Sequence, residues 1–382
     1  MRTGRALLVT MLFCTAGWSG CGRNDPAVET PAVSVAQETP ARNELSDRQK
    51  AAIELIGAAG GEMELDADGL PVRIDLASDR VFADETLVGA ALEFPDLKGL
   101  RLALSSVPDA TLAELASLAN LGELYLQDAA IDDARLADIL RAMPNLRRLT
   151  LRRLNGMTDQ ALDAVVACDQ MEVLALIEMN RITGAGLDRL AGCLKLRSLD
   201  LRNCGGLSPE DLKRLSAVKV LEEVKFGGPA IHDGLAEVIV GLPKVQSVTV
   251  EDAEISPAFV DKLASHAATA ERIRTLAFAR CYGVTDDALR SLGEFPSLES
   301  LSLRDILVTG SFLTGLNHEG SNPLPLKTLI AANAFLNDEA VASLPEVAPN
   351  LVRLDLRGNV GLSEGSRQVL QKLKNLKELT LP

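Results

Sequence analysis

Cysteine and histidine are the residues of this sequence best suited to nucleophilic or metal chemistry. A thiolate acts as a nucleophile or metal ligand, and an imidazole as a general base or zinc ligand, but both roles need several converging groups. His232, His266 and His318 occupy unrelated sequence contexts, and no GxxxxGK(S/T), HExxH, CxxC or GxSxG motif is present. No pair stands out among 53 acidic residues. We therefore expect no catalytic residue, no metal, no cofactor and no enzymatic activity.

Cys21 differs from the other cysteines because it ends a targeting-like segment. Residues 1–20 hold two arginines, an apolar run over 6–13 and then small residues, which is the order of a signal peptide. The run is too short to span a membrane. The ending WSGC resembles the bacterial lipobox, which implies a lipid on Cys21 and an anchor on the periplasmic or surface side of the cell envelope. Trp18 replaces the usual aliphatic residue there, so an ordinary cleaved signal is the alternative. Both interpretations predict export.

Two short segments follow before the main pattern begins. Residues 21–45 are rich in Pro, Ala, Thr and Glu without apolar periodicity, which predicts a disordered tether. Residues 46–76 predict an N-terminal cap. It consists of a helix over 46–60 that begins at Ser46 and a hairpin that turns at Asp68-Gly69.

The frame LxxLxL recurs at intervals of 24 to 28 residues, first in degenerate form at the end of the cap and then through a predicted repeat array over 77–382. Its first positions, beginning with a degenerate one, are Pro71, Leu97, Leu121, Leu146, Met171, Leu196, Leu221, Val245, Ile273, Leu298, Leu326, Leu351 and Leu376. Each frame predicts a strand with one buried face, and the residues after it predict a crossover helix. The predicted helix N-caps are Thr158, Ser208, Ser256, Thr285 and Ser363, with Pro209 and Pro257 at first helical positions.

The repeat resembles the leucine-rich repeat family. The closest subtype is the cysteine-containing, ribonuclease-inhibitor-like one, because a small residue or Cys follows the strand and a "TD..L" sequence opens the helix, as in 158–162 and 285–289. The resemblance implies an α/β solenoid with a parallel sheet on the concave face and helices on the convex face. It also implies a protein-protein interaction module that binds through the concave sheet. The alternative is a passive structural component of the cell envelope without a specific ligand.

The repeat assigns the inner cysteines to shared positions. Cys204 and Cys281 fall where other repeats have residues such as Ala129 and Met179, so we interpret them as core residues. Cys168 and Cys193 share another apolar position. A disulfide between these two stacked neighbours remains a minor alternative.

Charged residues form columns at the strand ends. The columns Asp128, Arg153, Glu178 and Asp252, Arg280, Asp305 predict that each arginine lies between two carboxylates. Arg202 and Arg357 have Asp200 and Asp355 two positions earlier, whereas Arg152 has no obvious partner. The predicted partner surface, on the concave face, consists of Tyr125, Arg148, Arg152, Ile177 and Arg202. An unspecialised solvated face is the alternative. The net charge of −14 argues against nucleic acid as a partner.

Overall fold

The computed structural model describes residues 45–78, 81–104, 107–317 and 322–382. The predicted signal peptide, Cys21, His318 and nearly all of the predicted tether lie outside the described residues. The account that follows concerns the unit that ends at residue 382 and contains all described residues.

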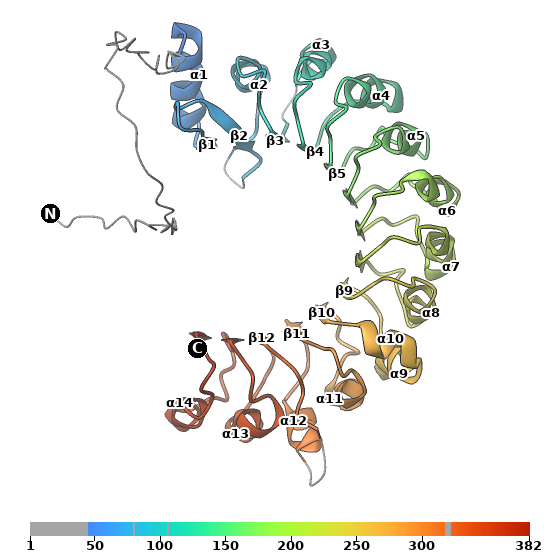
Figure 1. Cartoon of the computed structure of the whole chain (residues 1–382), viewed down its shortest axis with the longest axis vertical. Helices are drawn as coiled ribbons and strands as arrows, with labels where there is room; N and C mark the ends of the chain where they lie inside the picture. The colour runs from blue at the N-terminus through green and yellow to red at the C-terminus, as the bar shows by residue number, and fades with distance from the viewer. Residues whose placement is uncertain (1–44, 79–80, 105–106, 318–321) are drawn as a thin grey trace, which may run out of the picture. The chain divides into compact units, whose positions relative to one another are not determined.

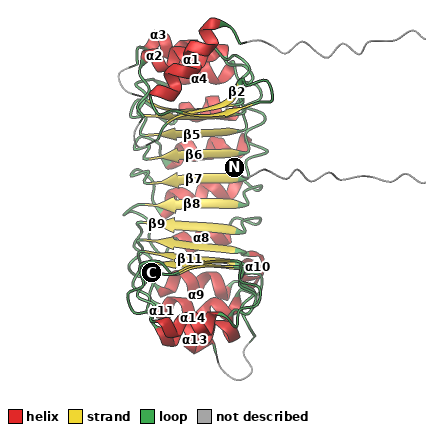
Figure 2. Cartoon of the chain, turned by 90° about the vertical axis from the view of Figure 1, so that its left-hand side faces the viewer, coloured by secondary structure: helices red, strands yellow, loops and turns green. Residues whose placement is uncertain are grey.

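One sheet contains every described strand, in sequence order (Figure 2). The strands are β1 Glu62–Leu65, β2 Pro71–Leu76, β3 Gly99–Ala103, β4 Glu123–Gln127, β5 Arg148–Arg152, β6 Val173–Ile177, β7 Ser198–Arg202, β8 Glu223–Gly227, β9 Ser247–Glu251, β10 Thr275–Ala279, β11 Ser300–Arg304, β12 Thr328–Ala332, β13 Arg353–Asp355 and β14 Glu378–Thr380. β1 and β2 are antiparallel, and every later neighbour is parallel.

α1 precedes the first strand, and from β2 onward helices connect successive strands; the helices lie on the outer side of the curved sheet (Figure 1). They are α1 Asp47–Ala58, α2 Glu85–Leu92, α3 Asp109–Ala113, α4 Asp133–Arg141, α5 Ala161–Val166, α6 Gly184–Leu187, α7 Pro209–Leu212, α8 Leu235–Val240, α9 Pro257–Ser265, α10 Ala267–Arg272, α11 Asp286–Leu289, α12 Ser311–Leu316, α13 Asp338–Val347 and α14 Glu364–Leu370. The 3₁₀ helices are η1 Glu114–Ser117, η2 Asp188–Gly192, η3 Lys213–Ala217 and η4 Arg290–Glu294. In the described part of the chain, no helix has the length and apolar character needed to cross a membrane.

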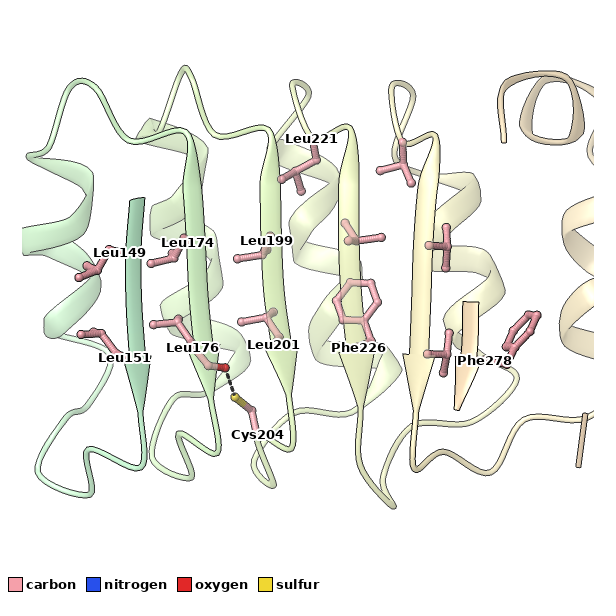
Figure 3. Close-up of a cluster of buried hydrophobic side chains, with 14 of the residues drawn as sticks. Leu149, Leu151, Leu174, Leu176, Leu199, Leu201, Cys204, Leu221, Phe226 and Phe278 are labelled. Atoms are coloured by element: carbon pink, nitrogen blue, oxygen red, sulfur yellow. Dashed lines mark hydrogen bonds between the residues drawn. The ribbon is translucent and has the colours of Figure 1, made fainter. Parts of the chain in front are cut away.

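The core is a stack of aliphatic side chains between sheet and helices. The register aligns Leu149, Leu174 and Leu199 on adjacent strands, and all three are fully buried (Figure 3). Each such side chain stabilises the fold by about 1.5–3 kcal/mol relative to exposure. Since one repeat has no second layer of its own, its buried face depends on its neighbours. The predicted parallel solenoid is confirmed.

The N-terminal segment has the expected elements. Ser46 and Gln49 form a reciprocal capping box at the start of α1, in which each side chain accepts a hydrogen bond from the other residue's backbone N–H. β1 and β2 form the expected hairpin, with Gly69 in the turn at φ 85°. This hairpin pairs with the first parallel strand, β3, and so connects α1 to the array.

Carboxylates that cross from one repeat to the next organise the helix starts. Ser208, Ser256 and Ser363 cap helices as predicted. The prediction for Thr158 is wrong, because α5 begins later, at Ala161. Its N–H and Oγ1 donate to Asp133 of the preceding repeat at 2.8 and 2.6 Å, and its Oγ1 accepts from the Gln160 N–H at 3.3 Å.

We call this arrangement the cross-repeat Asp contact. Asp159 accepts from the N–H and Oγ1 of Thr183 in the same way, at 2.8 and 2.7 Å. Thr158 therefore hydrogen-bonds to the preceding repeat, and Asp159 hydrogen-bonds to the following one. The other cross-repeat Asp contacts join Asp233 to Ser256, Asp286 to Thr309 and Asp338 to Ser363. Thr285, by contrast, precedes α11 without a side-chain capping bond.

Candidate interaction surface

The centre of the concave face contains an apolar strip beside arginines. Alternate residues of each strand point away from the core, and on β6 these are Val173, Ala175 and Ile177. Arg148 and Arg152 lie beside them on β5, in register with Val173 and Ile177. Arg148 is exposed and forms no ion pair with the residues that the structure describes. An arginine without an ion pair next to apolar side chains is typical of a recognition surface.

Tyr125 does not contribute to an exposed surface, and this prediction is wrong. Only 8% of the residue is exposed. The guanidinium carbon of Arg101 lies 4.2 Å from the ring centroid, and the phenol hydroxyl donates to Gln127 Oε1 at 2.6 Å. Because Arg101 and Tyr125 are in register on β3 and β4, the cation stacks on the ring from the neighbouring strand.

Arg152 has a partner, contrary to the sequence-based expectation. Its Nε and Nη2 donate to Glu178 Oε1 at 3.0 and 2.8 Å. Glu178 is not the register partner of Arg152, which is Ile177. The residue after Ile177 adopts φ 58°, and this left-handed turn brings the Glu178 carboxylate back toward β5. Arg152 is therefore a half-buried, paired cation.

Arg202 is held more tightly than any other predicted surface residue. It donates to both oxygens of Asp200, as expected, and its Nη1 donates to Glu251 Oε2 at 2.9 Å. Asp200 is buried, with 7% exposure. The hydrogen bond to Asp200 raises the pKa of the Arg202 guanidinium, and the contact to Glu251 acts in the same direction. We infer that Arg202 holds Asp200 and Glu251 in place, and that its charge is not free to bind a partner.

A left-handed residue follows the strand in repeat after repeat. The non-glycine residues at this position have φ between 52° and 58°. They are Asp128, Arg153, Glu178, Asn203, Asp252, Arg280, Asp305 and Asn333, and Gly228 and Gly358 occupy the same position. A left-handed conformation costs about 1–2 kcal/mol for an ordinary L-residue. The N–H groups offset part of this cost by extending the sheet, as when Asp128 donates to the Arg152 carbonyl at 3.1 Å.

Ion pairs join the left-handed residues, as the columns predict. Arg153 binds Asp128 at 2.7 Å and Glu178 at 3.6 Å, so it lies between two carboxylates. Arg280 binds Asp252 at 2.6 Å, but its second carboxylate is Glu251 at 3.5 Å and not Asp305. Asp305 instead accepts from the Asn333 amide at 2.9 Å. The sequence signal for the backbone itself was the recurrence of Asp, Asn and Gly in this column, because these residues tolerate positive φ best.

The concave face has a different charge balance from the whole chain. Its inward positions carry nine basic residues, namely Arg73, Arg101, Arg148, Arg152, Arg202, Lys225, Arg304, Arg353 and Arg357. They also carry nine acidic residues, namely Glu62, Glu64, Asp75, Glu123, Asp200, Glu223, Glu251, Asp355 and Glu378. These positions are balanced in charge, whereas the chain has a net charge of −14. The excess of acid therefore lies elsewhere in the chain.

The cysteines of the array are core residues, as expected. Cys204 Sγ donates to the Leu176 carbonyl at 3.0 Å (Figure 3), and Cys281 Sγ contacts the Val250 carbonyl at 3.4 Å. Burial raises the pKa of the Cys204 thiol to about 11. Cys168 and Cys193 are buried free thiols, so the structure contains no bond between them. Within the described ranges no cluster of His, Cys, Asp or Glu has the geometry to hold a metal ion.

Solved structures share this architecture at low sequence identity. A chain of the yeast Rad7 and Elc1 complex is 18% identical with a TM-score of 0.56, over 76% of this chain and 77% of that chain. An internalin, inlF of Listeria monocytogenes, is 18% identical with a TM-score of 0.47, over 88% of each chain. TLR13 in its complex with ssRNA13 is 19% identical with a TM-score of 0.49, over 76% of this chain and 40% of that chain. No protein-family model and no curated protein matches the sequence.

Proposed function

We propose that this chain, whose fold is the leucine-rich repeat solenoid, is an exported and lipid-anchored protein that binds a protein partner on its concave sheet. Binding is its activity, and it catalyses no reaction. The proposed contact surface is centred on Arg148 and the inward residues of β6, with Arg152 and Arg202 at its margins. A lipid at Cys21 would tether the array to the cell envelope, because lipid chains contribute about 0.8 kcal/mol per buried methylene.

The observation that carries this proposal is the pairing of charge on the sheet. Arg152 and Arg202 are neutralised by Glu178, Asp200 and Glu251, which keep both side chains in fixed positions. Arg148 has no such partner among the described residues and lies in register with Val173. A partner carboxylate beside an apolar group satisfies both features together. Preorganised neighbours reduce the entropy that such a contact costs.

The similarity to the Rad7 and Elc1 complex supports the fold on which the proposal depends. That structure is a complex between two proteins, and for the present chain a protein partner remains our proposal. Arg148, which is exposed and forms no ion pair among the described residues, supports a partner surface with an exposed carboxylate, since complementary charge increases association rates and selectivity.

Affinity capture with the immobilised full chain from a cell-envelope extract tests the proposal. We expect one saturable partner, and Arg148→Glu should weaken its binding by at least tenfold, because an ion pair becomes a like-charge contact. Arg141→Glu is the matched control, since this arginine is exposed on the outer helix α4. Equal binding by wild type and Arg148→Glu excludes this surface. No saturable partner at all favours the passive structural role.

A further inference from the structure

A row of exposed apolar side chains lies along one rim of the array. Tyr282, Leu307, Phe335 and Val360 each occupy the second position after the left-handed residue, in four consecutive repeats. Their exposed fractions are 62%, 51%, 58% and 91%. We call these four residues the apolar ridge. Single exposed apolar residues are normal on a protein surface, but a contiguous aligned set marks a contact site.

Preceding repeats do not have large apolar residues at this position. There it holds Ala130, Asn155, Asn180, Gly205, Ala230 and Glu254. The same backbone position thus tolerates small and polar residues, so the solenoid does not require large apolar ones. The ridge begins at Tyr282 and continues through Val360, and its composition needs an explanation other than folding.

Phe335 supports this reasoning because its backbone is strained. It has φ 35°, a value that bulky residues rarely adopt. The buried Asn359 side chain fixes this conformation, since its Oδ1 accepts from the N–H groups of Ala334 and Leu336 at 3.3 and 2.9 Å. The same amide donates to the Leu356 carbonyl at 2.8 Å. Phe335 is therefore held outward on both sides by a buried bond network, although Gly or Asn would fit this backbone better.

The concave floor beside the ridge consists mainly of small, uncharged residues. The inward positions of β9 to β12 are Ser247, Thr249, Glu251, Thr275, Ala277, Ala279, Ser300, Ser302, Arg304, Thr328, Ile330 and Ala332. Glu251 is bound by Arg202 and Arg280. Arg304 is exposed and has no ion-pair partner in the described ranges, although Asp355, itself bound by Arg357, lies near enough to feel its charge. The small side chains of the floor therefore allow a slender ligand to approach closely. Arg304 adds one positive charge that forms no ion pair with the described residues.

The shape and charge of this region identify the kind of occupant. A second copy of this array would meet the ridge edge to edge. A fully buried aromatic side chain contributes about 150–250 Å², but Tyr282 and Phe335 are only 62% and 58% exposed, and Leu307 and Val360 are smaller. The ridge alone therefore falls short of the ~800 Å² per partner that a standard interface buries. The net charge of −14 also opposes self-association and attraction to an anionic membrane. A slender polypeptide segment buries additional area because it also contacts the floor, and its few charges meet less repulsion than a second copy or an anionic membrane would.

We propose that the apolar ridge and Arg304 form a docking site for an extended segment of a partner protein, with apolar side chains on the ridge and a carboxylate on Arg304. This site is separate from the surface around Arg148. Leu307 and Phe335 are its central apolar contacts, and Arg304 selects an acidic over a basic segment.

Peptide selection with the full chain tests this proposal. A random dodecapeptide phage library should enrich sequences that combine Leu, Ile, Phe or Trp with Asp or Glu. The enriched peptide, synthesised with a fluorophore, should bind at least tenfold more weakly to Leu307→Gln and to Phe335→Asn in fluorescence anisotropy. Phe335→Asn suits the left-handed backbone, so its thermal midpoint should equal or exceed that of wild type. Arg304→Gln should weaken the acidic peptide more than its Gln or Asn counterpart, which isolates the ion pair.

Controls separate this site from other surfaces. Leu194→Gln removes an equally exposed apolar residue outside the ridge, and Arg148→Glu alters the other proposed surface. Both variants should bind the peptide as wild type does. The proposal is overturned by enrichment of basic peptides, by no enrichment, or by an affinity that Phe335→Asn leaves unchanged. A wild-type dimer in analytical ultracentrifugation that Phe335→Asn abolishes would assign the ridge to a second copy instead.

Discussion

Arg202 and Glu251 form an ion pair that passes over an entire repeat. Arg202 Nη1 lies 2.9 Å from the Glu251 carboxylate, although β8 separates their strands. Gly227 of β8 lies between them and has no side chain to block the approach. The same arrangement recurs near the N-terminus, where Arg73 reaches Glu123 at 2.7 Å past Gly99. Glycine in a strand thus allows coupling between second neighbours.

The two glycines should respond differently to substitution by alanine. A Cβ at Gly227 would lie 2.6 Å from the Glu251 carbonyl oxygen, whereas at Gly99 it would meet the flexible Arg73 Cγ at 3.1 Å. We expect Gly227→Ala to destabilise the array by about 1–3 kcal/mol because backbone must move. Gly99→Ala should change stability by less than about 0.5 kcal/mol. Urea unfolding followed by circular dichroism measures both, and equal effects would refute the steric explanation.

The cross-repeat Asp contacts should contribute more to stability than exposed ion pairs do. Asp133→Ala leaves the N–H and hydroxyl of Thr158 without their carboxylate, and we expect a loss of about 1–3 kcal/mol. Asp138→Ala, on the same helix, removes only exposed pairs with arginines and should cost under about 0.5 kcal/mol. The comparison uses the urea midpoints of the two variants. A larger effect at Asp138 would contradict the assignment.

Acid should weaken the ion pairs at the strand ends. The hydrogen bond from Arg280 holds the pKa of Asp252 below its ordinary value, and burial opposes this only partly. A depressed pKa in the folded state adds stability above the unfolded pKa, near 4, and this stability disappears as the pH falls through the folded value. Asp252→Asn should therefore lower stability by about 0.2–1 kcal/mol at pH 7.

The same variant should lose less stability than wild type between pH 5 and pH 2. Thermal midpoints recorded across this range provide the measurement. Because both partners are partly exposed, 1 M NaCl should narrow the difference at pH 7. Parallel pH profiles for wild type and variant would show that the Asp252–Arg280 pair contributes nothing.

The buried thiols should be unreactive in the folded protein. Burial raises the pKa of Cys193 and of Cys204 to about 11, so at pH 8 roughly one thiol in a thousand is ionised. Iodoacetamide at pH 8 should leave both unmodified for hours in native protein and label both in urea, as peptide mass spectrometry would report. Labelling of native Cys204 at the rate of a free thiol would contradict its place in the core.

Lipid attachment at Cys21 is proposed from the lipobox resemblance, and it has its own test. Metabolic labelling with a radioactive fatty acid should mark the wild-type chain, and Cys21→Ser should abolish the label. Cys204→Ala is the matched control and should keep it. Export without label in the wild type would favour the ordinary cleaved signal.

The repeat frame predicted the strands well because their period and buried face are local properties of the sequence. The alignment of Leu149, Leu174 and Leu199 follows directly from a spacing of 25 residues. Lateral contacts were harder to foresee. The stacking of Arg101 on Tyr125 was accessible in principle, since both lie in one column, but the phenol was assumed to point into solvent.

The predictions for Arg152 and Thr158 were wrong because they did not take account of the backbone conformation and of contacts between repeats. The pairing of Arg152 with Glu178 depends on a left-handed residue, and side-chain alternation does not describe such a residue. Thr158 was assigned to its own helix because capping rules consider one chain segment, whereas its actual partner, Asp133, is 25 residues away. The apolar ridge is predictable from the sequence, because four consecutive repeats have a large apolar residue at the same position. That position lies outside the strands, so the columns of strand residues do not contain it.

The cross-repeat Asp contacts do not join every pair of neighbours, and this divides the array into units of different cohesion. Asp133, Asp159 and their partners bond three consecutive repeats, but Gly184 offers no carboxylate to the next one. Ser208 instead bonds Asp211 of its own helix, whose carboxylate fills the space that Gly184 leaves. Transient opening should therefore favour the junctions without such a contact, of which the one between Thr183 and Ser208 is an example. In native-state hydrogen exchange, neighbouring repeats joined by the contact would behave as one foldon, protected as a block.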